Sequence, residues 1–225
     1  MSTCTLTYPT PALVTADSCG DLGETPPAFL LANAMALATE VHLHQLRKIA
    51  ASSYLSHPML TAGIVLKTGG TLRATTIALL HDVFEEGGPS ALNLLRKRFS
   101  KSIVDAVISM TPPPTDLLLP WVPRKEQSLS RIRQACALDV DVACAFGADK
   151  AATLWELELD CQHLGDVAVF SRMKRPQEML WYYQSCWQVL AASEINQSML
   201  SLLGCHVQWL RQRVDAYLHK SRSTD

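Results

Sequence analysis

The stretch ALLHDVFEEGGPS, residues 78–90, places one histidine and three carboxylates at the end of an otherwise apolar helical segment. Burying an acid without a counter-charge is costly, so a metal ion, a cationic partner or an exit into water must offset that cost. Residues four apart share a helix face, which predicts His81 over Glu85 and Asp82 over Glu86. By itself, the pattern fits a metal or proton-transfer site and a solvated helix end with a His81–Asp82 pair equally well.

Two more segments favour the metal. His57 precedes a proline at the start of a predicted helix, and Asp149 lies in a helical segment whose preceding residues are small or apolar. Solvation does not explain a lone carboxylate in such a helix. Two imidazoles and two carboxylates suit a divalent ion such as Mn²⁺ or Fe²⁺, with positions left open for water and substrate. The four candidate ligands, from three predicted helices, are His57, His81, Asp82 and Asp149.

The elements that must position these ligands are helices. Pro26 and Pro27 resemble a helix start, after which apolar residues recur at helical spacing and strand patterns are scarce. We therefore predict an all-α fold with a poorly ordered arm over residues 1–25, a single globular helical domain over 26–195, and an amphipathic helix with a short tail over 196–225 that packs on the domain. The predicted helices span residues 28–50, 57–68, 71–86, 90–98, 101–110, 125–138, 140–158, 176–194 and 197–218.

Composition narrows the classes of function. The formal net charge of −1 gives no global basic field for binding nucleic acid. The sequence has no apolar run long enough for a transmembrane helix and no signal-peptide pattern, so we expect a soluble protein without a membrane partner. Seven scattered cysteines, an odd number without a CxxC pair, indicate reduced thiols and hence a cytoplasmic protein. The sequence is compatible with a monomer and with a homo-oligomer.

Five sequence blocks form an ordered pattern along the chain: HLHQLRK at 42–48, SYLSHP at 53–58, IALLHDVFEE at 77–86, FSKSIVDAVISMT at 99–111 and FGADKAATL at 146–154. These blocks resemble the HD-domain phosphohydrolases, and most closely the (p)ppGpp hydrolase domain of RelA/SpoT homologues and small alarmone hydrolases. The resemblance runs from about residue 30 to 190, in order and at compatible intervals. It implies an HD-domain helical bundle that holds one Mn²⁺ through His57, His81, Asp82 and Asp149.

The resemblance also implies roles for residues around the metal. Glu85 and Glu86 would position or deprotonate the attacking water, and Arg47 and Lys48 would meet the nucleotide. The reaction would remove the 3′-pyrophosphate of (p)ppGpp, leaving GDP or GTP and pyrophosphate. The structural alternative for Arg47 and Lys48 is a solvated basic helix end.

Departures from the family pattern bear on the substrate. Thr153 stands where the family has an asparagine that helps to hold the nucleotide, and Glu86 replaces an aspartate. Thr153 is four residues after Asp149 and is expected to face the same cavity, but a hydroxyl cannot offer the paired donor and acceptor of an amide. A related metal-dependent phosphatase, for example for the 2′-phosphate of NADPH, is therefore an alternative. A non-catalytic nucleotide-binding HD protein is another, although no candidate metal ligand is lost.

Overall fold

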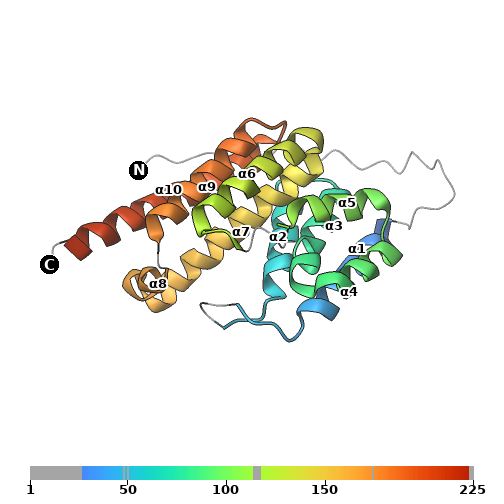
Figure 1. The fold of residues 1–225 in the computed structure, drawn as a ribbon, viewed down its shortest axis with the longest axis horizontal. Coiled ribbons are helices and arrows are strands. Elements are labelled where there is room, and N and C mark those ends of the chain that lie inside the picture. The colour runs from blue at the N-terminus through green and yellow to red at the C-terminus, as the bar shows by residue number, and fades with distance from the viewer. Residues whose placement is uncertain (1–26, 48, 50, 114–117, 174, 223–225) are drawn as a thin grey trace.

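The structure is a computed structural model that describes residues 27–47, 49, 51–113, 118–173 and 175–222. Within these ranges the chain forms ten α-helices and no β-strand, which confirms the predicted all-α fold (Figure 1). The predicted arm, residues 1–25, lies outside the described residues, and the division at residue 195 stays a prediction. The helices are α1 (Pro27–His42), α2 (Ser56–Lys67), α3 (Leu72–Leu80), α4 (Val83–Arg98), α5 (Lys101–Met110), α6 (Trp121–Leu138), α7 (Val140–Leu164), α8 (Asp166–Arg172), α9 (Pro176–Ala191) and α10 (Gln197–Arg222).

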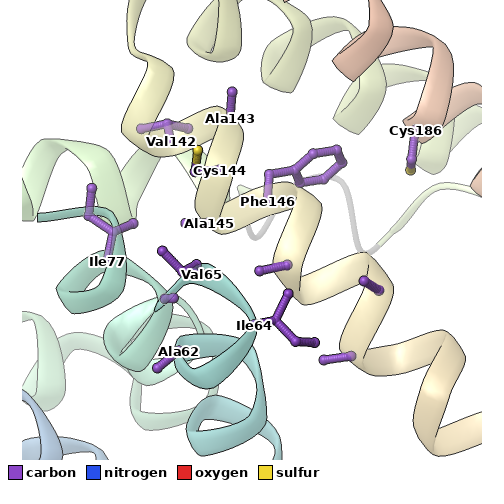
Figure 2. Packing of buried hydrophobic residues seen from close by; sticks show 14 of the residues in the cluster. Ala62, Ile64, Val65, Ile77, Val142, Ala143, Cys144, Ala145, Phe146 and Cys186 are labelled. Carbon is purple, nitrogen blue, oxygen red and sulfur yellow. The ribbon is translucent and has the colours of Figure 1, made fainter. Parts of the chain in front are cut away.

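Helix α7 is the centre of the hydrophobic core. It packs against α2 and α3 and also against α9 and α10. Figure 2 shows Val65 of α2 and Ile77 of α3 on one side of α7, and Cys186 of α9 on the other. Small residues allow this close approach, because a Cβ added to Gly147 would lie only 3.0 Å from the side chain of Met199. A polar side chain in the middle of α7 is therefore removed from water.

The chain between α1 and α2 is a loop, so the prediction of a helix reaching residue 50 was wrong. α1 ends at His42, and the backbone then doubles back, with an isolated antiparallel bridge between Leu46 and Ser53. Tertiary contacts override the helical pattern of the sequence, because Arg47 hydrogen-bonds to Glu156 of α7 and Tyr54 hydrogen-bonds to Asp82 at the α3–α4 junction. The loop thereby brings these two side chains to the edge of the candidate site.

The predicted helix over residues 71–86 is in fact two helices. α3 ends at Leu80 and α4 begins at Val83, with His81 and Asp82 at the junction. The main-chain N–H of Glu86 still donates to the Asp82 carbonyl at 2.9 Å, so the expected helical turn is kept. Adjacent residues of a straight helix point about 100° apart. At this junction the His81 Nε2 and Asp82 Oδ2 atoms instead approach to 3.2 Å, which lets both side chains reach one centre.

Helix α4 continues through the glycines that were expected to end a helix. It bends at Gly88, which has φ 63° and ψ −155°, a conformation that favours glycine. The predicted stop at residues 87–89 therefore appears as a kink, and the predicted helix over 90–98 is the second half of α4. Because of the kink, Glu85 and Glu86 lie in a short first segment next to the α3–α4 junction.

Other boundaries differ by a few residues from the predictions. α6 begins at Trp121 rather than 125, because Pro123 is tolerated in a first helical turn. α7 extends to Leu164, and α8 was not predicted. The C-terminal helix α10 packs against α7, α8 and α9. None of the helices in the described ranges has a segment long and apolar enough to cross a membrane.

Candidate metal centre and cleft

Four helices bring the candidate ligands together. His57 lies in the first turn of α2, His81 follows the end of α3, Asp82 precedes α4, and Asp149 lies in the middle of α7. Because α2, α3 and α7 pack against one another, these segments meet inside the molecule (Figure 1). His57, His81 and Asp149 are buried, and each offers a ligand atom within 4.8 Å of the others.

The distances within this centre are short. Asp149 Oδ1 lies 3.2 Å from His57 Nε2 and 3.7 Å from His81 Nε2. Asp82 Oδ2 lies 3.2 Å from His81 Nε2 and 3.9 Å from His57 Nε2. Two imidazole nitrogens therefore face two carboxylate oxygens around one point. The structure thus brings all four predicted ligands together.

The other ring nitrogen of each histidine is already engaged. His81 Nδ1 lies 2.8 Å from the Ala78 carbonyl, and His57 Nδ1 lies 3.1 Å from Glu156 Oε2. These oxygens can only accept, so each Nδ1 carries a proton and Nε2 is the ring nitrogen that faces the carboxylates. The Nε2 atom of His81 is buried and has no hydrogen-bond partner in the described part of the chain. Histidines that bind metals are commonly held in this way. The residues present therefore fit a divalent cation.

The pKa values of the two histidines also show that the buried carboxylates favour a positive charge beside them. Burial alone would lower the pKa of His81, but Asp82 and Asp149 raise it to about 9. Burial also opposes the charged form of His57, yet hydrogen bonds to Asp149 and Glu156 raise its pKa. Protons on these rings thus neutralise the carboxylates when no other cation is present, and a metal would displace them.

The carboxylates are held in their charged form. Burial would raise the pKa of Asp82, but the neighbouring His81 holds it well below its ordinary value. Asp149 is likewise buried, and its pKa is lowered first by Lys150 and then by His57. Lys150 Nζ donates to Asp149 Oδ2 at 2.6 Å, which leaves Oδ1 facing the histidines. Sequence reasoning missed Lys150, although its position directly after Asp149 is a usable signal.

Sequence reasoning also missed Glu156 and Tyr54. Glu156 forms an ion pair with Arg47 and orients His57, and Tyr54 donates a hydrogen bond of 2.7 Å to Asp82 Oδ2. Glu156 follows Asp149 by seven residues, two helical turns along the same face of α7, and this spacing could have identified it. Nothing in the sequence around Tyr54 indicates a contact with Asp82, because the loop conformation creates it.

A large cleft of about 1080 Å³ opens beside the centre. Arg47, Glu85, Glu86 and Thr153 all line it, so the structure brings these predicted residues to one cavity. Lys48 lies outside the described residues. Arg47 is not the solvated helix end of the structural alternative, because it belongs to the loop and pairs with a carboxylate of α7.

The polar side chains of the cleft differ in what they can do. Glu85 and Glu86 are both exposed to the cleft, and partial burial followed by the nearby Asp82 raises the pKa of Glu85. A carboxylate with a raised pKa is a better proton acceptor near neutral pH. The Thr153 hydroxyl donates at 2.9 Å to the main-chain carbonyl of Asp149, so its hydrogen is held by its own helix.

Comparisons with known proteins agree with this fold. A profile of the HD domain matches residues 34–166, whereas no curated protein matches the sequence significantly. A solved structure of a metazoan ortholog of SpoT, described as hydrolysing ppGpp and acting in starvation responses, is 18% identical, with a TM-score of 0.62, and covers 85% of this chain and 98% of that one. A crystal structure from Listeria monocytogenes EGD-e is 24% identical, with a TM-score of 0.57, and covers 68% of this chain and 97% of that one. Because the profile spans more than half of the sequence, this chain belongs to the HD domain family, as its five sequence blocks predicted.

Proposed function

We propose that this protein is a Mn²⁺-dependent phosphohydrolase that removes the 3′-pyrophosphate of (p)ppGpp. The observation that carries the proposal is the buried centre, in which the Nε2 atoms of His57 and His81 face two carboxylates beside a cleft of nucleotide size. The likeness of fold to the metazoan SpoT ortholog, which hydrolyses ppGpp, supports the choice of substrate.

The metal would be held by His57, His81, Asp82 and Asp149. When bound, a divalent ion of this kind lowers the pKa of a water molecule and so supplies a nucleophile near neutral pH. Every other part of the reaction depends on side chains of the cleft. The ligand atoms alternate between neutral nitrogen and charged oxygen, a set that suits Mn²⁺ or Fe²⁺.

The cleft residues would position the nucleotide and move the proton. Hydrolysis forms a bond from the water oxygen to the phosphorus that carries O3′ and breaks the bond from that phosphorus to O3′. Glu85 would accept the proton that the water loses, because its raised pKa suits that role and it lies at the edge of the centre. The departing O3′ takes up a proton to become the hydroxyl of GDP, and pyrophosphate is released. Glu86 would help to position the water, and Arg47 would meet the nucleotide at the other side of the cleft.

The test is product analysis of ppGpp incubated with the metal-free protein and with the same protein after addition of Mn²⁺. We expect GDP and pyrophosphate only with Mn²⁺, and Asp82→Ala should abolish both metal binding and turnover. Mn²⁺-dependent turnover that persists in Asp82→Ala would contradict the assignment. Metal binding without any turnover of ppGpp would contradict the substrate alone.

Thr153 favours a second candidate. Its hydroxyl is committed to the Asp149 carbonyl, so it does not replace the paired hydrogen bonds of an amide at this edge of the cleft. A phosphatase for another phosphorylated nucleotide, such as the 2′-phosphate of NADPH, would need different contacts there. The same assay with NADPH decides between them, because release of inorganic phosphate from NADPH at a higher kcat/KM than turnover of ppGpp would favour the second candidate.

A further inference from the structure

A second, smaller cavity adjoins the candidate metal centre. It measures about 70 Å³ and is bounded by α6, α7, α9, the end of α5, the α3–α4 junction and the first turn of α4. Ser128 and Arg131 of α6 contribute to its wall. The cavity and the large cleft share six lining residues, so the two spaces meet at the metal centre. The shared residues are Asp82, Glu85, Lys125, Asp149, Lys150 and Tyr182.

Two lysines flank the ring of Tyr182 in this cavity. Lys125 Nζ lies 4.5 Å from the centroid of that ring, and Lys150 Nζ lies 5.8 Å from it. Lys150 is paired with Asp149, whereas the ion pairs of the described residues include none with Lys125. Burial, and then the neighbouring Lys150, lower the pKa of Lys125 to about 8, and Glu85 in the same cavity opposes this shift without cancelling it. An anion between the two lysines would favour the charged form of Lys125.

The size of the cavity limits what the anion can be. Sites for drug-sized ligands measure roughly 300–1,000 Å³. A nucleoside can therefore occupy only the large cleft of about 1080 Å³, whereas the space of about 70 Å³ suits a compact group such as phosphate. A nucleotide bound in the cleft would direct its phosphate groups across the metal centre and into the smaller cavity, because the two spaces join there.

We propose that this smaller cavity is an anion subsite in which Lys125 and Lys150 hold the phosphate groups that hydrolysis releases. The identity of those groups rests on the proposed function, but the existence of the subsite does not. Lys125 is the informative residue, because it contacts aromatic rings rather than a candidate metal ligand. Lys150 is less useful for a test, since its removal would also disturb Asp149.

The test is calorimetric titration of the metal-free protein, residues 1–225, with sodium pyrophosphate and, separately, with inorganic phosphate at constant ionic strength. Lys125→Met removes the charge but keeps a long apolar stem against the aromatic rings, and Lys125→Gln is a second charge-removing variant should the first disturb the fold. Arg133→Met is the matched control, because Arg133 is exposed on the same helix and does not line the cavity.

We expect Lys125→Met to weaken pyrophosphate binding at least tenfold, as befits the loss of a charge-assisted contact. Lys125→Arg should retain binding, and Arg133→Met should match the wild type. Binding of GDP, which has no 3′-phosphate, should change much less in Lys125→Met than binding of pyrophosphate. If Lys125 has a purely structural role, Lys125→Met should bind pyrophosphate and GDP equally weakly and should melt at a lower temperature. That result would overturn the proposal.

The remaining outcomes separate the subsite from the proposed function. No pyrophosphate binding by the wild type, or equal losses in Lys125→Met and Arg133→Met, would overturn the subsite even if ppGpp is hydrolysed. Lys125-dependent binding in a protein that does not turn over ppGpp would uphold the subsite and contradict the proposed substrate. If ppGpp is a substrate, the inhibition constant of pyrophosphate should rise in Lys125→Met at least as much as the KM of ppGpp.

Discussion

Helix α7 carries two clusters of charged side chains that have different physical explanations. At its N-terminus, Arg73 of α3 donates at 2.7 Å to Asp139 and at 2.9 Å to Asp141. Asp139 also caps the helix by accepting from main-chain N–H groups. In the middle of the same helix, Asp149 is buried in the candidate metal centre, where its Oδ1 lies 3.2 Å from His57 Nε2 and 3.7 Å from His81 Nε2.

The difference lies in whether the charges are satisfied by the fold. In the terminal cluster, each carboxylate meets a guanidinium at a partly exposed site, so packing and capping explain it fully. In the central cluster, two imidazole nitrogens face two carboxylates, and His81 Nε2 has no hydrogen-bond partner among the described residues. Buried polar groups without partners are costly, and natural proteins keep them mainly where a ligand or a reaction needs them. Folding alone therefore explains the terminal cluster, whereas the central cluster has the composition and geometry of a divalent metal site.

The strongest test of this contrast exchanges one carboxylate in each cluster for an amide. Asp149→Asn should weaken Mn²⁺ binding by about 100-fold or more and abolish turnover, because a ligand charge is lost. Asp141→Asn, on the same helix, should change the dissociation constant for Mn²⁺ less than about twofold. Titration calorimetry measures the affinity, and circular dichroism checks that both variants fold. Retention of metal by Asp149→Asn would show that the central cluster is not a metal site.

A second prediction concerns the carboxylate that orients His57. Glu156→Gln should weaken Mn²⁺ binding by roughly 10–100-fold, since outer partners of metal-bound histidines have effects of this size. Glu158→Gln is the matched control, because Glu158 lies on the same helix but pairs with His206, 3.5 Å away. If the two variants bind Mn²⁺ equally well, Glu156 does not position a ligand.

The third prediction concerns the terminal cluster alone. Arg73→Met should lower the free energy of unfolding by about 1–2 kcal/mol, because Asp139 and Asp141 lose their shared partner. Urea denaturation gives the change in stability, and the affinity for Mn²⁺ should stay at the wild-type value. A large loss of metal affinity in Arg73→Met would mean that the two clusters are coupled through α7.

The smallest expected effect is a dependence of stability on pH. The hydrogen bond from Arg73 is the main cause that holds the pKa of Asp139 below its ordinary value of 3.8. A lowered pKa in the folded state means that the carboxylate stabilises the fold above its ordinary pKa and that this contribution is lost as the pH falls. Asp139→Asn keeps an acceptor for the helix cap, so it should cost about 1 kcal/mol at pH 7, and this cost should shrink as the pH falls below 3.8 and through the lowered pKa of the folded state. Urea titrations measure the difference in the free energy of unfolding between the wild type and Asp139→Asn at each pH. If this difference stays constant as the pH falls, the charge of Asp139 is not its source.

The sequence predicted which residues form the central cluster better than it predicted the helix boundaries that position them. The helical class follows from apolar spacing along the chain, and His57, His81, Asp82 and Asp149 were identified from residue types and family blocks. The predicted helix over 71–86 was wrong at His81, because periodicity continues through a break that tertiary packing imposes. The helix expected up to residue 50 failed for the same reason, since the loop after α1 is held by contacts with residues distant in the sequence.

What the sequence determined by itself is the helical class, the family and the chemical types gathered at the centre, because these depend on local spacing and residue identity. Tertiary structure alone decided that Glu156 orients His57, that Tyr54 reaches Asp82 and that Lys125 and Lys150 share a small cavity. Each of these contacts joins segments that lie on different helices or loops. Their distances depend on how α7 is surrounded by its neighbours, and hydrophobic periodicity specifies which face is buried but not which side chains meet there.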